Sequence, residues 1–277
     1  MMRALFLSSE RCKVPSDTPI ISSLPHAPGQ GESKPLSAIE RYAKASMTYE
    51  NKLRNSTQAI RQAFAQFSPL IQASSLGAED VVITHLIEKE GLDIPTFVLE
   101  TGALHPETVE LLQRAQARAG IPVQVFRPQA QAIDSFVTVN GSDAMYRSIA
   151  LRKACCGIRK MEPLARALEG QRAWITGLRQ EQSGARAEVP LVDMREEASG
   201  GRIKCNPLAH WTWGDVWHYI ALHGLDYNPL HDRFFPSIGC APCTRAISDG
   251  EDFRAGRWWW ESESAKECGL HVKETTP

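Results

Sequence analysis

Apolar and polar positions along the chain follow two different patterns. Between residues 37 and 67 apolar side chains such as Ile39, Tyr42, Leu53 and Ile60 return on recurring faces, which predicts helical structure. After residue 68, short apolar runs alternate with stretches of helical character. This alternation favours an α/β fold with a mainly parallel sheet flanked by helices.

The same pattern predicts the individual elements that follow residue 68. Strands are expected at residues 69–75, 95–100, 122–126 and 173–177. Helices are expected at residues 80–88, 106–119, 156–168 and 213–223. From residue 203 the pattern is otherwise irregular, and after Pro229 we expect a loop interrupted by Gly, Pro and Cys.

These patterns of apolar and polar residues divide the chain into three predicted segments. Residues 1–36 are rich in Ser, Pro, Gly and Lys with little apolar periodicity, which is typical of a disordered leader. Residues 37–257 carry the strand and helix pattern and are expected to form a single α/β domain. Residues 258–277 have too few apolar side chains after Trp260 to pack well, so we expect a mobile C-terminal tail.

Composition narrows the class of protein. The chain has 277 residues, of which 43% are apolar and 23% charged, as in ordinary globular proteins. Its formal net charge of −1 means that an anionic ligand must be held by local positive charge, and no basic recognition helix for nucleic acid is present. No run approaches the ~18 apolar residues of a membrane span. The N-terminal apolar run is too short for a secretory signal, so we expect a cytoplasmic protein without a membrane partner.

Two loops follow expected strands in a way that suits ligand binding. The stretch SSLGAED at residues 74–80 joins a strand to a helix N-terminus through Gly77, as anion and nucleotide cradles do, but it lacks the lysine of a Walker loop. A tight connection with Gly at positive φ is the alternative. The turn at Thr101 and Gly102 also lies at a strand end; helix capping accounts for the following Pro106, but not for His105.

Cysteines form the next candidate site. The total of seven is odd, which does not suit a secreted disulfide framework. The vicinal pair Cys155 and Cys156 and the C-x-x-C pair Cys240 and Cys243 together offer four thiolates, enough for a tetrahedral metal or a cubane cluster. Adjacent cysteines diverge and suit the larger cluster. Zinc, a disulfide and buried thiols are the alternatives.

Basic residues flank both cysteine pairs. Arg159 and Lys160 follow the vicinal pair, and Arg254 and Arg257 follow the C-x-x-C loop. If the cysteines converge, these cations converge with them and form a pocket for oxyanions, to which Arg offers forked donors. Each cation taken alone also fits a solvated surface charge.

The tail contains a further cysteine, Cys268, within Lys266-Glu-Cys-Gly-Leu-His271. Too little chain remains after it to bury the thiol, which favours a redox or nucleophilic role over a packing role. Lys266 and His271 favour its thiolate, whereas Glu267 opposes it. An incidental surface cysteine is the alternative.

Together these segments closely resemble the assimilatory adenylyl-sulfate reductases, the iron–sulfur branch of the family that also contains the phosphoadenylyl-sulfate reductases. The resemblance covers residues 50–272 and rests on SSLGAEDVV, LETGALHPET, KACCGIRKMEPL, WITGLRQEQSGARAEVP, IGCAPCTRAI and ECGLH. The most specific parts are ECGLH in a C-terminal tail and the vicinal pair with a later C-x-x-C. Many relatives have Ser-Phe-Ser-Gly before Ala78, and Asp in place of Glu100.

The resemblance implies a fold like that of the adenine nucleotide α-hydrolases and a thioredoxin-dependent reduction of adenylyl sulfate to sulfite and AMP, in sulfate assimilation and cysteine biosynthesis. Cys268 would attack the sulfate sulfur and become an S-sulfocysteine, from which thioredoxin or a glutaredoxin-like reductant releases sulfite. The residues 37–257 would then form a nucleotide-binding and iron–sulfur domain. The implied ligands of a [4Fe–4S] cluster are Cys155, Cys156, Cys240 and Cys243. The implied contacts to the phosphosulfate are Lys160, Arg254, Arg257 and His271, and those to the nucleotide are Ser74, Leu99, Gly177 and Arg186.

Three other functions are weaker. A phosphoadenylyl-sulfate (PAPS) reductase has the same tail chemistry, but members specialised for that substrate usually lack the four cysteines. A nucleotidyl transferase of the ATP pyrophosphatase type needs a Ser-Gly-Gly-x-Asp-Ser loop, which Ala78 and Glu79 interrupt. A non-catalytic iron–sulfur or zinc regulator needs no tail thiol. A homo-oligomer is compatible with the sequence, and Cys12 and Cys205 have no expected task.

Overall fold

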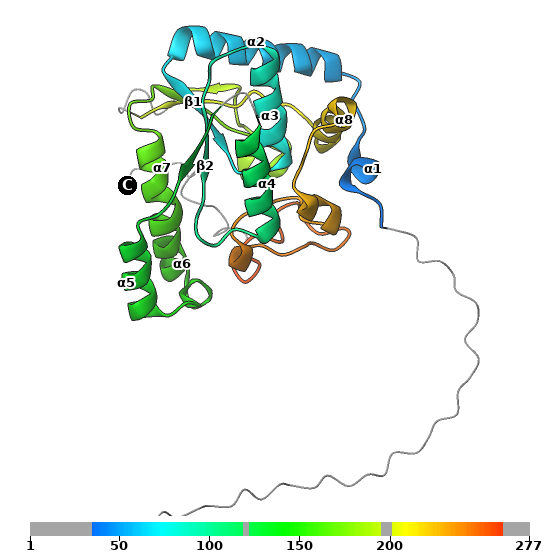
Figure 1. The fold of residues 1–277 in the computed structure, drawn as a ribbon. Helices are drawn as coiled ribbons and strands as arrows, with labels where there is room; N and C mark the ends of the chain where they lie inside the picture. Colours follow the sequence, from blue (N-terminus) through cyan, green and yellow to red (C-terminus); the bar gives the residue numbers. More distant parts are fainter. Residues whose placement is uncertain (1–34, 119–121, 195–200, 263–277) are drawn as a thin grey trace, which may run out of the picture. The chain divides into compact units, whose positions relative to one another are not determined.

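The computed structural model describes residues 35–118, 122–194 and 201–262 (Figure 1). The expected leader therefore lies almost entirely outside the described residues. The helical region expected at 37–67 consists of two helices, α1 (Ala38–Tyr42) and α2 (Tyr49–Phe67). Ser37 begins α1 with a capping box, in which its hydroxyl accepts a hydrogen bond from the Glu40 amide and the Glu40 carboxylate accepts one from the Ser37 amide.

Within the described residues, six strands form one sheet in the order β3-β2-β1-β4-β6-β5. Their bounds are Leu70–Ser74 (β1), Thr96–Leu99 (β2), Val123–Phe126 (β3), Ala173–Ile175 (β4), Val192–Asp193 (β5) and Ile203–Cys205 (β6). All neighbours pair in parallel except β5, which runs antiparallel to β6 at the edge. The expected mainly parallel sheet is thus confirmed. The strands β5 and β6 were not predicted, because two or three residues are too few to show an alternating pattern.

Helices cover both faces of the sheet. Leu70, Ile175 and Ile203 belong to a core that includes apolar residues of α2, α3 (Ala78–Lys89) and α8 (Trp213–His223). Ile71 and Phe97 point to the opposite face, where they pack with α7 (Glu162–Ala167). This division follows from the strand geometry, since successive side chains point to opposite faces. Figure 1 shows α4 (Pro106–Ala117) beside α3, in front of the sheet.

The helix expected at residues 156–168 is the second part of a longer one. It begins as α6 (Ile149–Cys156), where the Ser148 hydroxyl caps the Leu151 amide, and continues through a π-helical turn (Gly157–Met161) into α7. Pro163 lacks the amide hydrogen needed for a regular α-helical ladder, which accounts for the wider turn just before it. Helix α5 (Ala130–Asn140) was not predicted, although Ile133, Phe136 and Val137 recur at helical spacing; none of its residues is fully buried.

The first residues of the expected tail pack on the domain. Trp258 is 1% exposed, and Glu261 forms an ion pair with Arg152 of α6 in which both side chains are buried. Residues 258–262 therefore belong to the packed structure, and the remaining part of the expected tail lies outside the described residues. No helix in the described part of the chain is long and apolar enough to cross a membrane.

Candidate active site

A cavity of about 220 Å³ opens at the carboxyl ends of the central strands. The chain passes from β1 to β2 and β3 on one side, whereas β4 lies on the other side of β1. The cavity thus lies where the strand order reverses, the usual ligand site of open α/β sheets. Its walls come from the segments that follow β1, β2 and β4, from the π-helical turn, and from residues 231–258.

Seven of the eight side chains expected to bind substrate line this cavity. They are Ser74, Leu99, Lys160, Gly177, Arg186, Arg254 and Arg257. The eighth, His271, and the expected nucleophile Cys268 lie outside the described residues. Ser74 and Leu99 are the last residues of β1 and β2, and Gly177 follows β4. The parallel strands bring these three positions together.

The loop between β1 and α3 does not have the conformation of the alternative, a tight connection with Gly at positive φ. The residue with positive φ is Leu76 (φ 60°), whereas Gly77 is extended (φ −73°) and caps α3. The loop is tied by Asp80, whose carboxylate accepts hydrogen bonds from the Ser75 amide (2.6 Å) and hydroxyl (2.7 Å). Burial raises the pKa of Asp80 to about 6, although the bonds from Ser75 lower it. At Gly177 there is no room for a side chain, because a Cβ would lie 2.5 Å from an Asp80 carboxylate oxygen.

A buried polar network supports the adjoining wall. Glu79 accepts hydrogen bonds from Arg179 Nε (2.9 Å) and from Gln182 Nε2 (2.9 Å). Gln182 in turn accepts a bond from Arg186 Nη1 (2.6 Å). The network fixes Arg186 at the cavity wall. Glu79 and Gln182 also line the cavity, and neither was identified from sequence, where they resemble ordinary polar residues of a helix start and a loop.

The expected cysteine site is adjacent to this cavity. Cys155, Cys240 and Cys243 are buried together with Met145 and Trp258, and Cys156 follows Cys155 at the end of α6. Cys240 also lines the cavity, and its sulfur lies 3.3 Å from the Thr101 hydroxyl. The C-x-x-C turn is held against the strand-end loop, because the Ala241 amide donates to the Ala103 carbonyl. The fold thus brings together the two cysteine pairs, which are more than eighty residues apart in sequence.

Burial of the thiols opposes their ionisation, so thiolates at this site need a nearby positive group. Burial raises the pKa of Cys155, while the cations Arg159 and Lys160 lower it. Burial likewise raises the pKa of Cys243 to about 11, although the positive charges of Lys160 and Arg257 lower it. Deprotonation of these buried thiols therefore requires a stronger positive partner, which a metal group supplies. The five described cysteines are free, so the disulfide alternative is not realised. Among the described side chains, no three His, Cys, Asp or Glu residues are arranged around one metal ion position.

The cations near the cysteines have different environments. The Arg257 guanidinium lies against the backbone of Gly239, donates to the Ile238 carbonyl (3.2 Å), and has its Cζ 4.8 Å from the Trp258 ring centroid. Arg159 donates to the Thr101 carbonyl (2.7 Å) and is not among the residues that line the cavity. Lys160, Arg254 and Arg257 therefore converge at the cavity as expected, whereas Arg159 lies beside Cys155 and Thr101.

One further cavity residue, His231, was missed because it lies in the irregular part of the sequence. Burial lowers its pKa to about 4, against the opposing effect of Glu79, so the imidazole is neutral near neutral pH. Its ring packs against Trp217 at 5.2 Å between centroids and against Trp213 at 5.8 Å. It gives this wall an uncharged polar group.

Comparison with known proteins gives a consistent assignment. The phosphoadenosine phosphosulfate reductase domain matches residues 69–246. The adenosine 5′-phosphosulfate reductase of Allochromatium vinosum is 49% identical over 220 residues, covering 79% of this chain and 85% of its own. The enzyme of that name from Burkholderia cepacia is 52% identical over 205 residues, covering 74% and 81%. That of Neisseria meningitidis serogroup B is 44% identical over 254 residues, covering 91% and 97%.

Solved structures confirm the fold. Phosphoadenylyl-sulfate (PAPS) reductase from Candida auris, in a phosphate complex, superposes with a TM-score of 0.58 at 24% identity, covering 72% of this chain and 97% of its own. Candida glabrata FMN adenylyltransferase, with FAD and pyrophosphate, gives 0.52 at 12% identity, covering 88% and 83%. At these identities the likeness concerns the fold alone.

Proposed function

Since the chain belongs to the phosphoadenosine phosphosulfate reductase domain family, we propose that it reduces adenylyl sulfate (adenosine 5′-phosphosulfate) to sulfite and AMP. Relatives named for this substrate are 44–52% identical to the chain. The single observation that carries the proposal is that seven residues expected from the sequence to bind substrate line one cavity. Cys240 of the cysteine group lines the same cavity.

The nucleotide part of the substrate binds at the strand ends. Ser74, Leu99 and Gly177 surround the adenosine with backbone and small side chains, and Arg186 is held there through Gln182. Gly177 leaves room for the Asp80 carboxylate, which fixes the loop that borders the adenosine. This half of the cavity orients the substrate and contributes binding energy that is independent of the sulfate.

The phosphosulfate binds between Lys160, Arg254 and Arg257. The sulfate sulfur is surrounded by oxyanions, which repel an attacking thiolate, so these cations are needed to neutralise them. They also stabilise the phosphate charge that develops on the departing AMP. His271 completes this set in the proposal, on the strength of the ECGLH motif.

Cys268 is the proposed nucleophile. Its thiolate forms a bond to the sulfate sulfur, and the bond between that sulfur and the phosphate oxygen breaks, so that AMP leaves and Cys268 carries the SO₃ group. A thioredoxin or glutaredoxin-like dithiol then attacks the Cys268 sulfur and displaces sulfite. The second thiol of the reductant closes its own disulfide and returns Cys268 to the thiol, which balances the two electrons consumed.

The four grouped cysteines fit a [4Fe–4S] cluster as the proposed cofactor. Three of them share one buried apolar site, the fourth is adjacent in sequence, and Lys160 and Arg257 offset the charge of their thiolates. When bound, such a cluster would supply iron–thiolate bonds that tie the end of α6 to the C-x-x-C turn.

Because free thiols persist in reducing compartments, we also propose that the protein is located in the cytoplasm.

The decisive experiment is mass spectrometry of the protein after incubation with adenylyl sulfate and no reductant. We expect an adduct with the mass of SO₃ on the peptide that contains Cys268, removed by thioredoxin with release of sulfite. Cys268→Ser should abolish the adduct, and Cys12→Ser serves as the matched control that keeps it. No adduct in the wild type, or an adduct elsewhere, refutes the mechanism. A faster reaction with the 3′-phosphorylated nucleotide identifies a PAPS reductase instead.

A further inference from the structure

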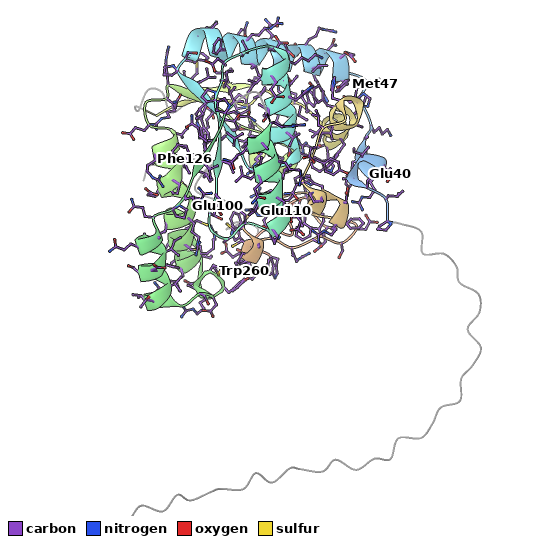
Figure 2. The ribbon with its side chains drawn as sticks, in the orientation of Figure 1. Glu40, Met47, Glu100, Glu110, Phe126 and Trp260 are labelled. Atoms are coloured by element: carbon purple, nitrogen blue, oxygen red, sulfur yellow. The ribbon has the colours of Figure 1, made fainter. Side chains whose placement is uncertain are left out.

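An aromatic patch is exposed beside the cysteine group. It consists of Tyr146, Trp259 and Trp260, of which Tyr146 and Trp259 are 45% and 40% exposed; the 42% exposed Ile149 follows Tyr146 three residues later in sequence. The ring centroids of Tyr146 and Trp260 are 4.6 Å apart, those of Trp259 and Trp260 4.8 Å, and those of Tyr146 and Trp259 6.3 Å. Figure 2 labels Trp260 at the lower edge of the domain.

The patch is held rigidly. The Tyr146 hydroxyl donates to the Pro242 carbonyl at 2.7 Å. The exposed Trp259 and the partly buried Trp260 lie between Trp258, which is buried, and Glu261, whose ion pair with Arg152 is buried. Fixed aromatic side chains lose little conformational entropy on binding, and Trp and Tyr are the residues most often found at binding hot spots.

The position of the patch relates it to the proposed chemistry. Pro242, which Tyr146 contacts, lies between Cys240 and Cys243, and Trp260 packs against the buried cysteine group. Cys268 is only eight residues beyond Trp260 in sequence. Because an extended chain spans at most about 3.6 Å per residue, the two Cα atoms are no more than about 29 Å apart. A protein that attacks the sulfur of Cys268 therefore acts on a residue that is tethered within this distance of Trp260.

We propose that the aromatic patch is the docking surface for the dithiol reductant, a protein of the thioredoxin type; this inference rests on the proposed function. The reductant must arrive, exchange thiols and leave in each turnover, so its contact must be weak. Transient redox contacts bury less than about 1,200 Å², which a few aromatic anchors can dominate. In this arrangement the reductant's thiolate attacks Cys268 Sγ, sulfite leaves, and the second thiol releases the reductant as a disulfide.

The test separates the two half-reactions with Trp259→Ala and Ile149→Ala. Formation of the SO₃ adduct on Cys268 needs no reductant, and dithiothreitol can remove it without docking. We expect both rates to match wild type, whereas kcat/KM for thioredoxin falls about tenfold to thirtyfold, the loss of one hot-spot residue. Leu222→Ala removes a 62% exposed apolar side chain from α8 and should leave all three rates unchanged.

Each other outcome overturns the inference. An unchanged kcat/KM for thioredoxin means that the patch does not bind it. Equal slowing with dithiothreitol means that the patch acts on the tail or the fold. A change in oligomeric state, measured by light scattering, without an effect on thioredoxin identifies a contact between copies of the chain.

A binding experiment distinguishes failure of this inference from failure of the proposed function. Isotope-labelled thioredoxin is titrated with the protein in the absence of substrate, and its NMR resonances are followed. Wild type should shift resonances around the thioredoxin dithiol, and Trp259→Ala should not. If wild type causes these shifts but forms no SO₃ adduct, the proposed reaction is refuted and the docking surface is not. If wild type and Trp259→Ala cause equal shifts, the docking surface alone is refuted.

Discussion

Arg152 and Glu261 form a two-pronged ion pair that is almost completely buried, with Nε–Oε1 and Nη2–Oε2 distances of 2.9 and 2.6 Å. Arg152 Cζ also lies 4.7 Å from the centroid of the Trp258 ring. The pair joins the helix that carries Cys155 to the end of the segment that carries Arg254 and Arg257.

Loss of one partner should therefore destabilise the protein strongly. Glu261→Gln leaves the Arg152 charge buried without its counterion, and we expect the free energy of unfolding to fall by about 3–5 kcal/mol. Urea denaturation measures this loss. Glu162→Gln, which breaks the half-exposed pair of Glu162 with Arg166, is the control and should cost less than about 1 kcal/mol. Equal losses in the two variants would show that the buried pair contributes no more to the free energy of unfolding than the half-exposed one.

Lys160→Ala should impair the use of substrate far more than the binding of AMP, because this cation is assigned to the sulfate end of the cavity. We expect kcat/KM for adenylyl sulfate to fall about 100-fold or more, as when one stabilising donor is removed from a transition state. The dissociation constant of AMP, measured by calorimetry, should change less than about threefold. Lys153→Ala, an exposed lysine on α6, is the matched control. Equal losses for AMP and substrate would move Lys160 to the nucleotide end.

Gly239→Ala should displace Arg257 without unfolding the protein. A Cβ at this position would lie 2.6 Å from Arg257 Cζ, and the guanidinium is the flexible end of its side chain, so it can move away. We expect KM for adenylyl sulfate to rise about tenfold, near the weight of one charged hydrogen bond, with little change in melting temperature. Gly184→Ala, where no atom lies within 4 Å of the new Cβ, is the control. An unchanged KM would show that the position of Arg257 is unimportant.

The stability of the protein should depend on pH through Asp80. Burial raises its folded-state pKa to about 6, whereas an unfolded aspartate titrates near 3.9, so from about pH 4 to pH 6 only the folded state retains the proton. The protonated Asp80 carboxyl group contributes up to about 3 kcal/mol to the free energy of unfolding. This contribution is fully present below about pH 4 and is lost as the pH rises through 6. His231 has the opposite dependence, since its folded-state pKa is lowered to about 4.

Asp80→Asn removes the first of these two contributions. The free energy of unfolding of the variant, relative to wild type, should increase as the pH rises from about 4 to about 7, because only wild type then has to ionise a buried carboxyl group. Urea denaturation across this range measures the difference, in which the contribution of His231 cancels. A difference that does not vary with pH would show that Asp80 titrates normally.

The metal content tests the cysteine group directly. Protein purified without oxygen should be brown, absorb near 400 nm and contain about four irons per chain, as expected for a [4Fe–4S] cluster. Cys240→Ser should lose this absorbance, whereas Cys205→Ser, which changes a buried cysteine of the main core, should keep it. A content of one zinc and no iron per chain would contradict the cluster and indicate a mononuclear zinc site.

Much of the fold and of the candidate site was predictable because it depends on local patterns. The loops that begin at Ser74 and Leu99 were found from sequence since parallel strands end at the same edge of a sheet, whereas the contact of these two residues with the nucleotide was implied by the resemblance. Residues Cys155 and Cys240 were found from their spacing to a second cysteine. These signals are carried by neighbouring residues, so a single sequence contains them.

The remaining features depend on distant contacts. Gln182 acquires its position from Glu79, 103 positions away, and His231 packs against Trp213 and Trp217, 18 and 14 positions away; no local pattern marks either residue. Leu76, and not Gly77, has the positive φ, because the loop is fixed by Asp80 and the Leu76 side chain is buried next to Val98. The burial of Trp258 likewise depends on its packing with Met145 and Cys155.

The walls of the cavity come from widely separated parts of the chain, and this has a consequence for biogenesis. Domains generally begin to fold from the N-terminal side during synthesis. The strand ends that carry Ser74, Leu99 and Gly177 leave the ribosome early, whereas Cys240, Cys243 and Arg257 emerge much later. A nascent chain therefore presents a nucleotide platform before the anion-binding wall exists. Insertion of the proposed cluster would have to wait until translation has passed residue 243, since Cys240 and Cys243 are not available before that point.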